Sequence, residues 1–259
     1  MSEPLVVRSR DNALLVRLRK LTRTPGAYRK LGAVWIEGEH LCAALRACGR
    51  KPAQALVSQS AWQAPVLRAL AQWAAQVVVV PDALFATVSG LGSPAGIGFV
   101  IETPAEPAVK AGVASVVLDR VQDAGNVGSI LRSAAAMGFT QVLALEGSAA
   151  LWSPKVLRAG MGAHFALDLI EGIAPAGLDA LGLPLLAGSP HAEATLDAVS
   201  LPFPCTWVFG HEGQGIAPSL LARCTQTLRI AQPGGQESLN VAAAAAICLY
   251  ATALRRGGS

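Results

Sequence analysis

The segment Glu237-Ser238-Leu239-Asn240-Val241-Ala242-Ala243-Ala244 places a polar serine and a polar asparagine, two residues apart, at the start of an alanine-rich helix. The residues before it, Gln232-Pro233-Gly234-Gly235-Gln236, predict a loop, because proline and paired glycines interrupt both helices and strands. A glycine-rich loop that runs into a helix N-terminus lets a ligand approach the backbone and favours negative charge. The segment therefore indicates a ligand site.

Two further loops combine polar residues with glycine in the same way. They are Asn126-Val127-Gly128-Ser129-Ile130-Leu131-Arg132 and Gly210-His211-Glu212-Gly213-Gln214-Gly215. Each loop follows an apolar strand-like run and precedes a helix-like run. Ligands in parallel α/β sheets bind beyond the carboxyl ends of the strands, so we expect the three loops to form one composite site.

Residues 106–259 alternate apolar runs with helical patterns, which predicts a parallel sheet covered on both faces. The expected strands are 115–119, 141–145, 184–187, 206–209 and 227–230. The expected helices are 127–137, 154–159, 218–224 and 238–254.

Residues 1–105 predict a smaller α/β domain. Its expected helices are 11–21, 40–48, 61–75 and 81–88, and its expected strands are 32–36, 55–58, 77–80 and 96–101. A linker is expected at 102–108, which holds two prolines and two acids between apolar runs. We therefore divide the chain into domains 1–105 and 106–259.

Cysteine and histidine usage argues against a metal site or a disulfide framework. The chain has five cysteines, an odd number without CxxC spacing, and four histidines without metal-ligand spacing. We expect buried, reduced thiols and no bound metal. The N-terminus lacks an apolar signal core and the longest uncharged run near the C-terminus is too short to span a bilayer, so we expect a cytoplasmic protein with no membrane segment.

Positive charge is concentrated in the first part of the chain. Residues 1–105 hold 12 Lys and Arg against 6 Asp and Glu, whereas residues 106–259 hold 9 against 11. Such a basic end is the electrostatic footprint of a nucleic-acid binder, although a solvated helix face explains the charge equally well. The expected RNA-binding residues are Arg8, Arg10, Arg17, Arg19, Lys20 and Arg23.

The polar residues of the loops allow more than one role. Arg132 presents a fixed fork of donors suited to phosphate. Asn126 could equally be a helix N-cap, and Glu212 could equally cap the helix that follows it. The glycine spacing from Gly210 to Gly215 differs from a dinucleotide fingerprint, and the chain has no GxxxxGK phosphate loop, which argues against a nicotinamide-linked oxidoreductase.

The motifs NVGSILRSAAAMGF, FGHEGQGI and ESLNVAAAAAICLY, in this order, resemble those of the SPOUT superfamily and, within it, of the SpoU (TrmH-like) RNA 2′-O-ribose methyltransferases. SPKVLRAGMGAHF is similar to an intermediate segment of that family. Residues 8–100, through RKLGAVWIEGEHLCAAL and SPAGIGFVIE, resemble an L30e-like substrate-binding domain.

The resemblance implies an α/β fold: a C-terminal parallel-sheet SPOUT domain with a trefoil knot and a small N-terminal α/β L30e-like domain. It implies a homodimer that binds S-adenosyl-L-methionine and methylates a ribose 2′-hydroxyl, with large-subunit rRNA favoured as the substrate. The alternatives are a tRNA 2′-O-ribose methyltransferase and a non-catalytic RNA-binding or ribosome-assembly protein.

The resemblance also implies site residues. The expected catalytic residues are Arg132, Asn126, Glu212, Ser238 and Asn240, and the expected cofactor-binding residues are Gly210, Ile230, Leu239, Ala187 and Gly215. Arg132 either activates the ribose hydroxyl or stabilises the developing alkoxide while it holds a phosphate. The chain departs from the family pattern at four places: Ala124 stands where proline is common, His211 where a small or amide residue is usual, and Gly160 where serine is usual, while Ile230-Ala231-Gln232-Pro233 replaces the common Ile-Pro-Met pattern.

Overall fold

The computed structural model describes residues 3–255 of the chain, which divide into two compact units. The first unit consists of the chain up to Ala105 together with Trp152–Phe165, and the second consists of Glu106–Leu151 and the chain from Ala166 onward. The sequence placed Trp152–Phe165 in the second domain, whereas in the structure this segment packs with the first. Each unit is described by itself below.

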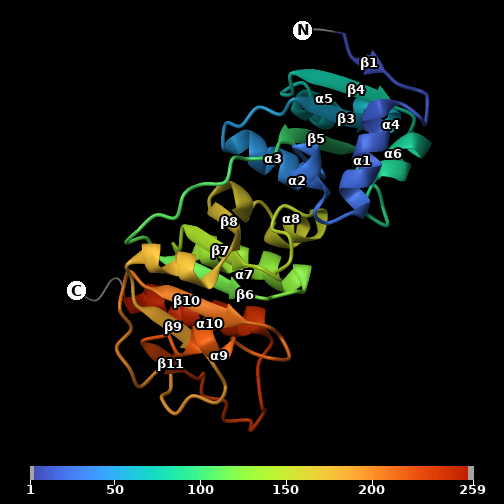
Figure 1. Ribbon diagram of the computed structural model, residues 1–259. Coiled ribbons are helices and arrows are strands. Elements are labelled where there is room, and N and C mark those ends of the chain that lie inside the picture. Colours follow the sequence, from blue (N-terminus) through green and yellow to red (C-terminus); the bar gives the residue numbers. More distant parts are fainter. Residues whose placement is uncertain (1–2, 256–259) are drawn as a thin grey trace. The chain divides into compact units, whose positions relative to one another are not determined.

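The first unit contains a five-stranded mixed sheet in the order β1-β4-β3-β5-β2 (Figure 1). Pairs β1–β4 and β3–β4 are parallel, whereas β3–β5 and β2–β5 are antiparallel. Strand β1 was not predicted, because it has only two residues and both side chains are exposed. The strands are β1 (Leu5–Val6), β2 (Ala33–Glu37), β3 (Gln54–Ser58), β4 (Gln76–Val80) and β5 (Ile97–Glu102).

Helices of the first unit surround this sheet. The single helix expected at 61–75 is wrong: the segment forms two helices, because Pro65 has no N–H and occupies the first position of a new helix. Helix α8 is contributed by the later part of the chain and packs against β2. The helices are α1 (Ala13–Arg23), α2 (Ala27–Leu31), α3 (Glu39–Ala47), α4 (Gln59–Gln63), α5 (Pro65–Ala71), α6 (Asp82–Val88), α8 (Pro154–Gly160) and the 3-10 helix η1 (Ala163–Phe165).

The second unit contains a six-stranded sheet in the order β11-β9-β10-β6-β7-β8, and every pair of neighbours is parallel. This confirms the predicted parallel sheet. Strand β8 was missed because Asp168, Glu171 and Gly172 interrupt its apolar pattern. The strands are β6 (Ser115–Asp119), β7 (Gln141–Leu145), β8 (Asp168–Ile173), β9 (Leu185–Gly188), β10 (Thr206–Gly210) and β11 (Gln226–Leu228). The trefoil knot implied by the family resemblance stays a prediction.

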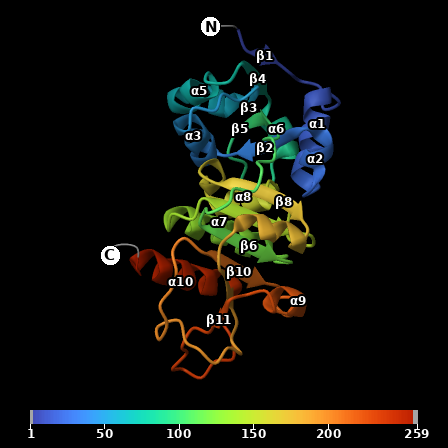
Figure 2. The same ribbon diagram turned by 60° about the vertical axis from the view of Figure 1, so that its left-hand side comes forward.

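Both faces of this sheet are covered. Helices α7 (Ala124–Ala136) and α10 (Val241–Leu254) pack against each other, and α10 contacts β10 and β9 (Figure 2). Trp207 of β10 stacks on Phe209 with ring centroids 5.9 Å apart and donates its Nε1–H to Oγ1 of Thr252 on α10 at 2.9 Å. On the other face, Val208 packs in a core with residues of η2 (Pro175–Leu181) and α9 (Pro218–Leu221). Each fully buried Val or Leu stabilises the fold by roughly 1.5–3 kcal/mol, so the sheet is a firm base for the loops at its edge.

The carboxyl ends of four neighbouring strands set the position of these loops. Gly210 at the end of β10 lies opposite Asp119 at the end of β6, and Leu228 at the end of β11 lies opposite Gly188 at the end of β9. The chain segments that follow these strands therefore start side by side along one edge of the sheet.

The cysteines follow the sequence prediction only in part. Cys42, Cys205 and Cys248 are buried, and burial raises the pKa of Cys205 and of Cys248 to about 12, so these thiols stay protonated at neutral pH. The expectation is wrong for Cys48, which is exposed, and for the half-buried Cys224. Within residues 3–255, no helix has both the length and the apolar character needed to cross a bilayer.

Candidate functional site

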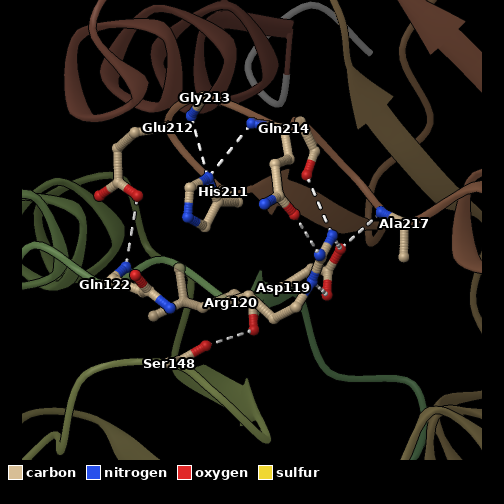
Figure 3. A network of polar contacts seen from close by, with 11 residues as sticks. Asp119, Arg120, Gln122, Ser148, His211, Glu212, Gly213, Gln214 and Ala217 are labelled. Atoms are coloured by element: carbon tan, nitrogen blue, oxygen red, sulfur yellow. Dashed lines mark hydrogen bonds and ion pairs between the residues drawn. The ribbon is translucent and has the colours of Figure 1, made fainter.

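The Glu212 carboxylate joins the loop after β10 to the connection between β6 and α7. It accepts hydrogen bonds from the backbone N–H group of Gln122 at 3.3 Å (Figure 3), from that of Asp123 at 3.1 Å, and from Nδ2 of Asn126 at 3.1 Å. Helix α9 begins only at Pro218, so Glu212 does not cap it. Its side chain instead bridges two loops that lie far apart in the sequence.

A second amide extends this bridge to the third loop. Oδ1 of Asn126 accepts a hydrogen bond from Nδ2 of Asn240 at 3.0 Å. Oδ1 of Asn240 in turn caps α10 by accepting from the backbone N–H groups of Ala242 at 2.9 Å and Ala243 at 3.3 Å. One chain of hydrogen bonds therefore runs from Glu212 through Asn126 to Asn240, with one residue from each polar loop.

The helix boundaries explain why Asn126 is free to make these contacts. Helix α7 starts at Ala124 rather than at Val127, and Asp123 is its N-cap, with Oδ1 accepting from the Asn126 N–H at 2.8 Å. The reading of Asn126 as an N-cap is therefore wrong, and its side chain remains available to Glu212 and Asn240. Similarly, α10 starts three residues later than the predicted Ser238.

The charge of Glu212 fixes the direction of this hydrogen-bond chain. Partial burial raises the pKa of Glu212, but hydrogen bonds from the Asn126 side chain and from backbone N–H groups outweigh it and hold the pKa below its ordinary value. The ionised carboxylate can only accept hydrogen bonds. Asn126 must therefore turn Nδ2 toward Glu212 and Oδ1 toward Asn240.

The loop after β10 is tight enough to require glycine at both of its ends. A Cβ atom on Gly210 would lie 2.3 Å from the carbonyl carbon of Gly215, whose own φ of +67° is in the left-handed region. His211 and Gly215 exchange two backbone hydrogen bonds of 3.0 and 2.8 Å. Nδ1 of His211 also accepts from the N–H groups of Gly213 at 3.0 Å and Gln214 at 3.2 Å, which places the ring proton on Nε2 in the neutral imidazole (Figure 3).

Two polar residues that the sequence analysis missed hold the far side of this loop. Asp119 is buried at the end of β6, and its Oδ2 accepts from the Ala217 N–H at 2.6 Å. Arg120 pairs with both carboxylate oxygens of Asp119 at 3.0 and 3.1 Å and also donates to Oε1 of Gln214 at 3.0 Å and to the Gly215 carbonyl at 3.3 Å. The hydrogen bonds that Arg120 donates to Asp119 raise the pKa of Arg120. The sequence feature that could have identified them is an acidic and a basic residue side by side at the end of an apolar strand.

Arg132 and Ser238 stand outside this network. Arg132 lies on α7 six residues beyond Asn126, and its exposed guanidinium makes no hydrogen bond or ion pair with any residue in the range 3–255. The exposed hydroxyl of Ser238 likewise has no partner in the described part of the chain. Both groups are therefore available to a molecule outside the protein, and their catalytic roles stay predictions.

The expected cofactor-binding residues gather along the carboxyl edge of the sheet. Ala187 is buried near the end of β9, Gly210 ends β10, and Ile230 lies two residues beyond β11. Leu239, 38 % exposed, lies just before the N-cap of α10. Gln232 lies between Ile230 and Leu239 in the sequence. Its buried Oε1 atom lacks a hydrogen-bond partner among the described residues, so it can accept a hydrogen bond from an N–H group of a ligand.

The expected RNA-binding residues fall into two groups. Arg17 donates to the Leu31 carbonyl and Arg19 to the Arg10 carbonyl, each at 2.7 Å, so these two guanidinium groups hold the fold of the first unit. The remaining side chains are exposed and make no hydrogen bond or ion pair within the described chain: Arg8, Arg10, Lys20 and Arg23. In the same described range, no group of three His, Cys, Asp or Glu side chains could hold a metal ion.

Comparison with known proteins gives a consistent set of similarities. The sequence profile of the SpoU rRNA Methylase family matches residues 114–250. The 23S rRNA (guanosine(2553)-2′-O)-methyltransferase RlmP of Bacillus subtilis is 31 % identical over 68 % of this chain and 71 % of its own. A TrmH-family RNA methyltransferase structure from Porphyromonas gingivalis covers 95 % of this chain and 98 % of its own with a TM-score of 0.81 and 31 % identity.

A third similarity concerns the fold alone. The SpoU methyltransferase AviRb from Streptomyces viridochromogenes, solved in complex with AdoMet, has a TM-score of 0.85 over 95 % of this chain and 98 % of its own, at 22 % identity. The mixed α/β architecture with its parallel second sheet is therefore an established arrangement.

Replacing Glu212 with glutamine tests the bridge between the loops. A glutamine side chain has a single acceptor oxygen, so Glu212→Gln should lower the free energy of unfolding at neutral pH. Because the folded state lowers the pKa of Glu212, its stabilisation is present above its ordinary pKa of 4.5 and is lost as the pH falls through the folded-state value. Urea unfolding at pH 7 and at several pH values below 4.5 should show the wild-type advantage shrinking with acidity.

The matched control is Glu237→Gln, because Glu237 is exposed and makes no hydrogen bond within the described chain. This control should not reproduce the pH-dependent difference. An advantage of wild type over Glu212→Gln that stays constant down to acid pH would contradict the assignment.

Proposed function

Because the chain belongs to the SpoU rRNA Methylase family, we propose that it transfers a methyl group from S-adenosyl-L-methionine to a ribose 2′-hydroxyl in ribosomal RNA, with large-subunit RNA as the substrate. The observation that carries this proposal is the hydrogen-bond chain Glu212–Asn126–Asn240, which joins the three loops whose motifs match the family. The B. subtilis relative acts on a 23S rRNA ribose, which supports the choice of RNA.

The carboxyl edge of the second sheet fits the proposed cofactor. Gly215 presents exposed backbone without side-chain bulk, Leu239 offers an exposed apolar surface, and Gln232 offers a buried acceptor oxygen without a partner among the described residues. S-adenosyl-L-methionine carries amino N–H groups and apolar surface of the matching kinds. When bound, it supplies a methyl group on a positively charged sulfur.

Arg132 is the residue that we propose acts on the RNA. A guanidinium group is a poor proton acceptor, so we do not assign Arg132 the removal of the hydroxyl proton. Its N–H groups, which have no partner within residues 3–255, can instead stabilise the developing alkoxide and hold a flanking phosphate. Asn126 and Arg132 share one helix, so the network that fixes Asn126 also sets the position of Arg132.

We further propose that the first unit is an L30e-like RNA-binding domain. The exposed Lys20 and Arg23 lie three residues apart on α1, away from its buried Leu15, Leu18 and Leu21. Helix α8 belongs to the same unit and contains two more basic residues, Lys155 and Arg158, and no acidic residue. Phosphate contacts from such a surface position RNA without specifying a sequence.

We also propose that the protein acts as a homodimer in the cytoplasm. Helix α10 supports the dimer, because Ile247, Tyr250 and Leu254 are 39 %, 52 % and 62 % exposed at helical spacing. An apolar stripe of this kind is typical of a surface that meets another protein.

Replacing Arg132 tests the catalytic assignment. Arg132→Ala should lower turnover by about 10²–10³-fold, the usual cost of losing one preorganised donor to a developing oxyanion. The dissociation constant for S-adenosylmethionine should stay unchanged, because Arg132 lies outside the expected cofactor residues. Turnover is measured on rRNA fragments by nuclease digestion and mass spectrometry, which also separates ribose from base methylation.

The Arg132→Lys variant is the control, because it keeps the charge and loses the planar fork. Partial turnover in this variant indicates that charge contributes, and none indicates that the fork is needed. Near-native turnover of Arg132→Ala, or methylation of a base, would overturn the assignment.

Charge reversal tests the RNA-binding surface. The double variant Lys20→Glu, Arg23→Glu should weaken RNA binding and flatten its salt dependence by about one unit of slope for each phosphate that the surface no longer neutralises. Arg17 and Arg19 are left intact because they hold the fold. Deletion of residues 1–105 is avoided because it would strip α8 of its partner β2.

Filter binding at several salt concentrations gives both quantities. Arg50→Glu, Lys51→Glu is the control, because both residues are exposed in the same unit and the change in net charge is identical. Equal losses of affinity in the two double variants would show that overall charge, rather than the α1 surface, binds the RNA.

Replacing the exposed apolar residues of α10 tests the dimer. Ile247→Glu, Tyr250→Glu should shift the sedimenting mass from two chains to one, because two carboxylates would have to lose water on association. Val66, which is 67 % exposed in the first unit, provides the control Val66→Glu. A wild-type protein that sediments as a single chain would refute the proposal.

A further inference from the structure

Arg120 has a backbone conformation that its residue type does not favour. Its φ of 57° lies in the left-handed region, and only one other non-glycine residue in the described chain, Met161, has a positive φ. Glycine adopts this region at little cost, whereas a residue with a Cβ atom is strained there. Strained backbone persists where the surrounding structure holds it in place, and such positions cluster at functional sites.

The contacts of the Arg120 side chain account for this strain. Its guanidinium spans both carboxylate oxygens of Asp119, Oε1 of Gln214 and the Gly215 carbonyl, which uses nitrogen atoms Nε, Nη1 and Nη2. Asp119 also holds the loop beyond, through the Ala217 N–H. The Asp119–Arg120 pair therefore fixes the loop 211–217 at three points: 214, 215 and 217.

This loop contains the residues that the proposed function needs. Glu212 is held on its other side by Asn126 and the N–H groups of Gln122 and Asp123, whereas Gly215 belongs to the expected cofactor edge. Asp119 pairs with the charge of Arg120, and the protein accepts four hydrogen bonds from its guanidinium group. Its contacts act on the shape of the loop.

We propose that Arg120 is a positioning residue that holds the loop 211–217 in the conformation that binds the cofactor, and that the chain retains a strained residue at the end of β6 for this purpose. The inference rests on the proposed function, because it takes the loop to be part of an S-adenosylmethionine site. It adds a residue that the three motifs do not contain. The backbone strain and the role in cofactor binding can be tested separately, the first by melting temperature and the second by cofactor affinity.

The test compares Arg120→Gly with Arg120→Ala in the full-length protein. Both variants lose the side-chain contacts, but only glycine relieves the left-handed backbone. Calorimetry should give dissociation constants for S-adenosylmethionine that are at least about tenfold larger in both variants than in the wild-type protein. A change of this size is expected when a mutation outside a binding site shifts the position of that site. The melting temperature of Arg120→Gly should exceed that of Arg120→Ala. At saturating cofactor, kcat of both should return close to the wild-type value while KM for the cofactor stays raised.

Arg223→Ala is the matched control, because it breaks another arginine–aspartate pair of the same unit, Arg223–Asp179, and should leave cofactor affinity unchanged. Wild-type affinity in Arg120→Gly would overturn the positioning role, and equal melting temperatures of the glycine and alanine variants would overturn the role of strain. Weaker binding in which kcat fails to recover at saturating cofactor would instead show a merely structural role. Failure of the wild-type protein to bind S-adenosylmethionine would instead refute the proposed function.

Discussion

The ionised carboxylate of Glu212 is the interaction on which the arrangement of the site depends. It accepts from two backbone N–H groups and one side-chain amide of the segment 122–126, so a loop after one strand is tied to the loop after its neighbour. Because a carboxylate has no donor, it also orients Asn126, and Asn126 orients Asn240. A single acidic group thus determines the direction of the side-chain hydrogen bonds that join the three loops.

The parts of the fold that follow from local patterns were predictable. Strands β6 and β7 match their predicted bounds, because a strand buried on both faces appears as a short, continuous apolar run. Strand β8 carries two acids and a glycine, so only its pairing with β7 identifies it. The break at Pro65 was predictable from the sequence and was overlooked, since proline marks a helix start as clearly as an end.

The motifs indicated Glu212, Asn126 and Asn240, which the structure joins by hydrogen bonds, but they did not indicate Asp119 or Arg120 and could not predict the hydrogen bonding of any side chain. Three arginines show the reason: Arg132 has no partner in the described chain, Arg120 donates partly to residues more than ninety positions away, and Arg17 donates to a carbonyl of α2. Their side chains are chemically identical, so the difference lies in partners that only the folded chain brings near. A cluster of basic residues in sequence therefore combines groups that are open to outside molecules with groups that hold the fold.

The segment Trp152–Phe165 has a consequence for how the protein is made. It completes the first unit, yet it is encoded after strands β6 and β7 of the second unit. During synthesis, β2 lacks its contact with α8 until residue 165 has left the ribosome. Part of the second unit has been synthesised by then. Neither unit is encoded by one continuous stretch of the gene. A single crossover between the genes of two relatives therefore cannot exchange a whole unit, because it would separate Trp152–Phe165 from the rest of the first unit or divide the second unit.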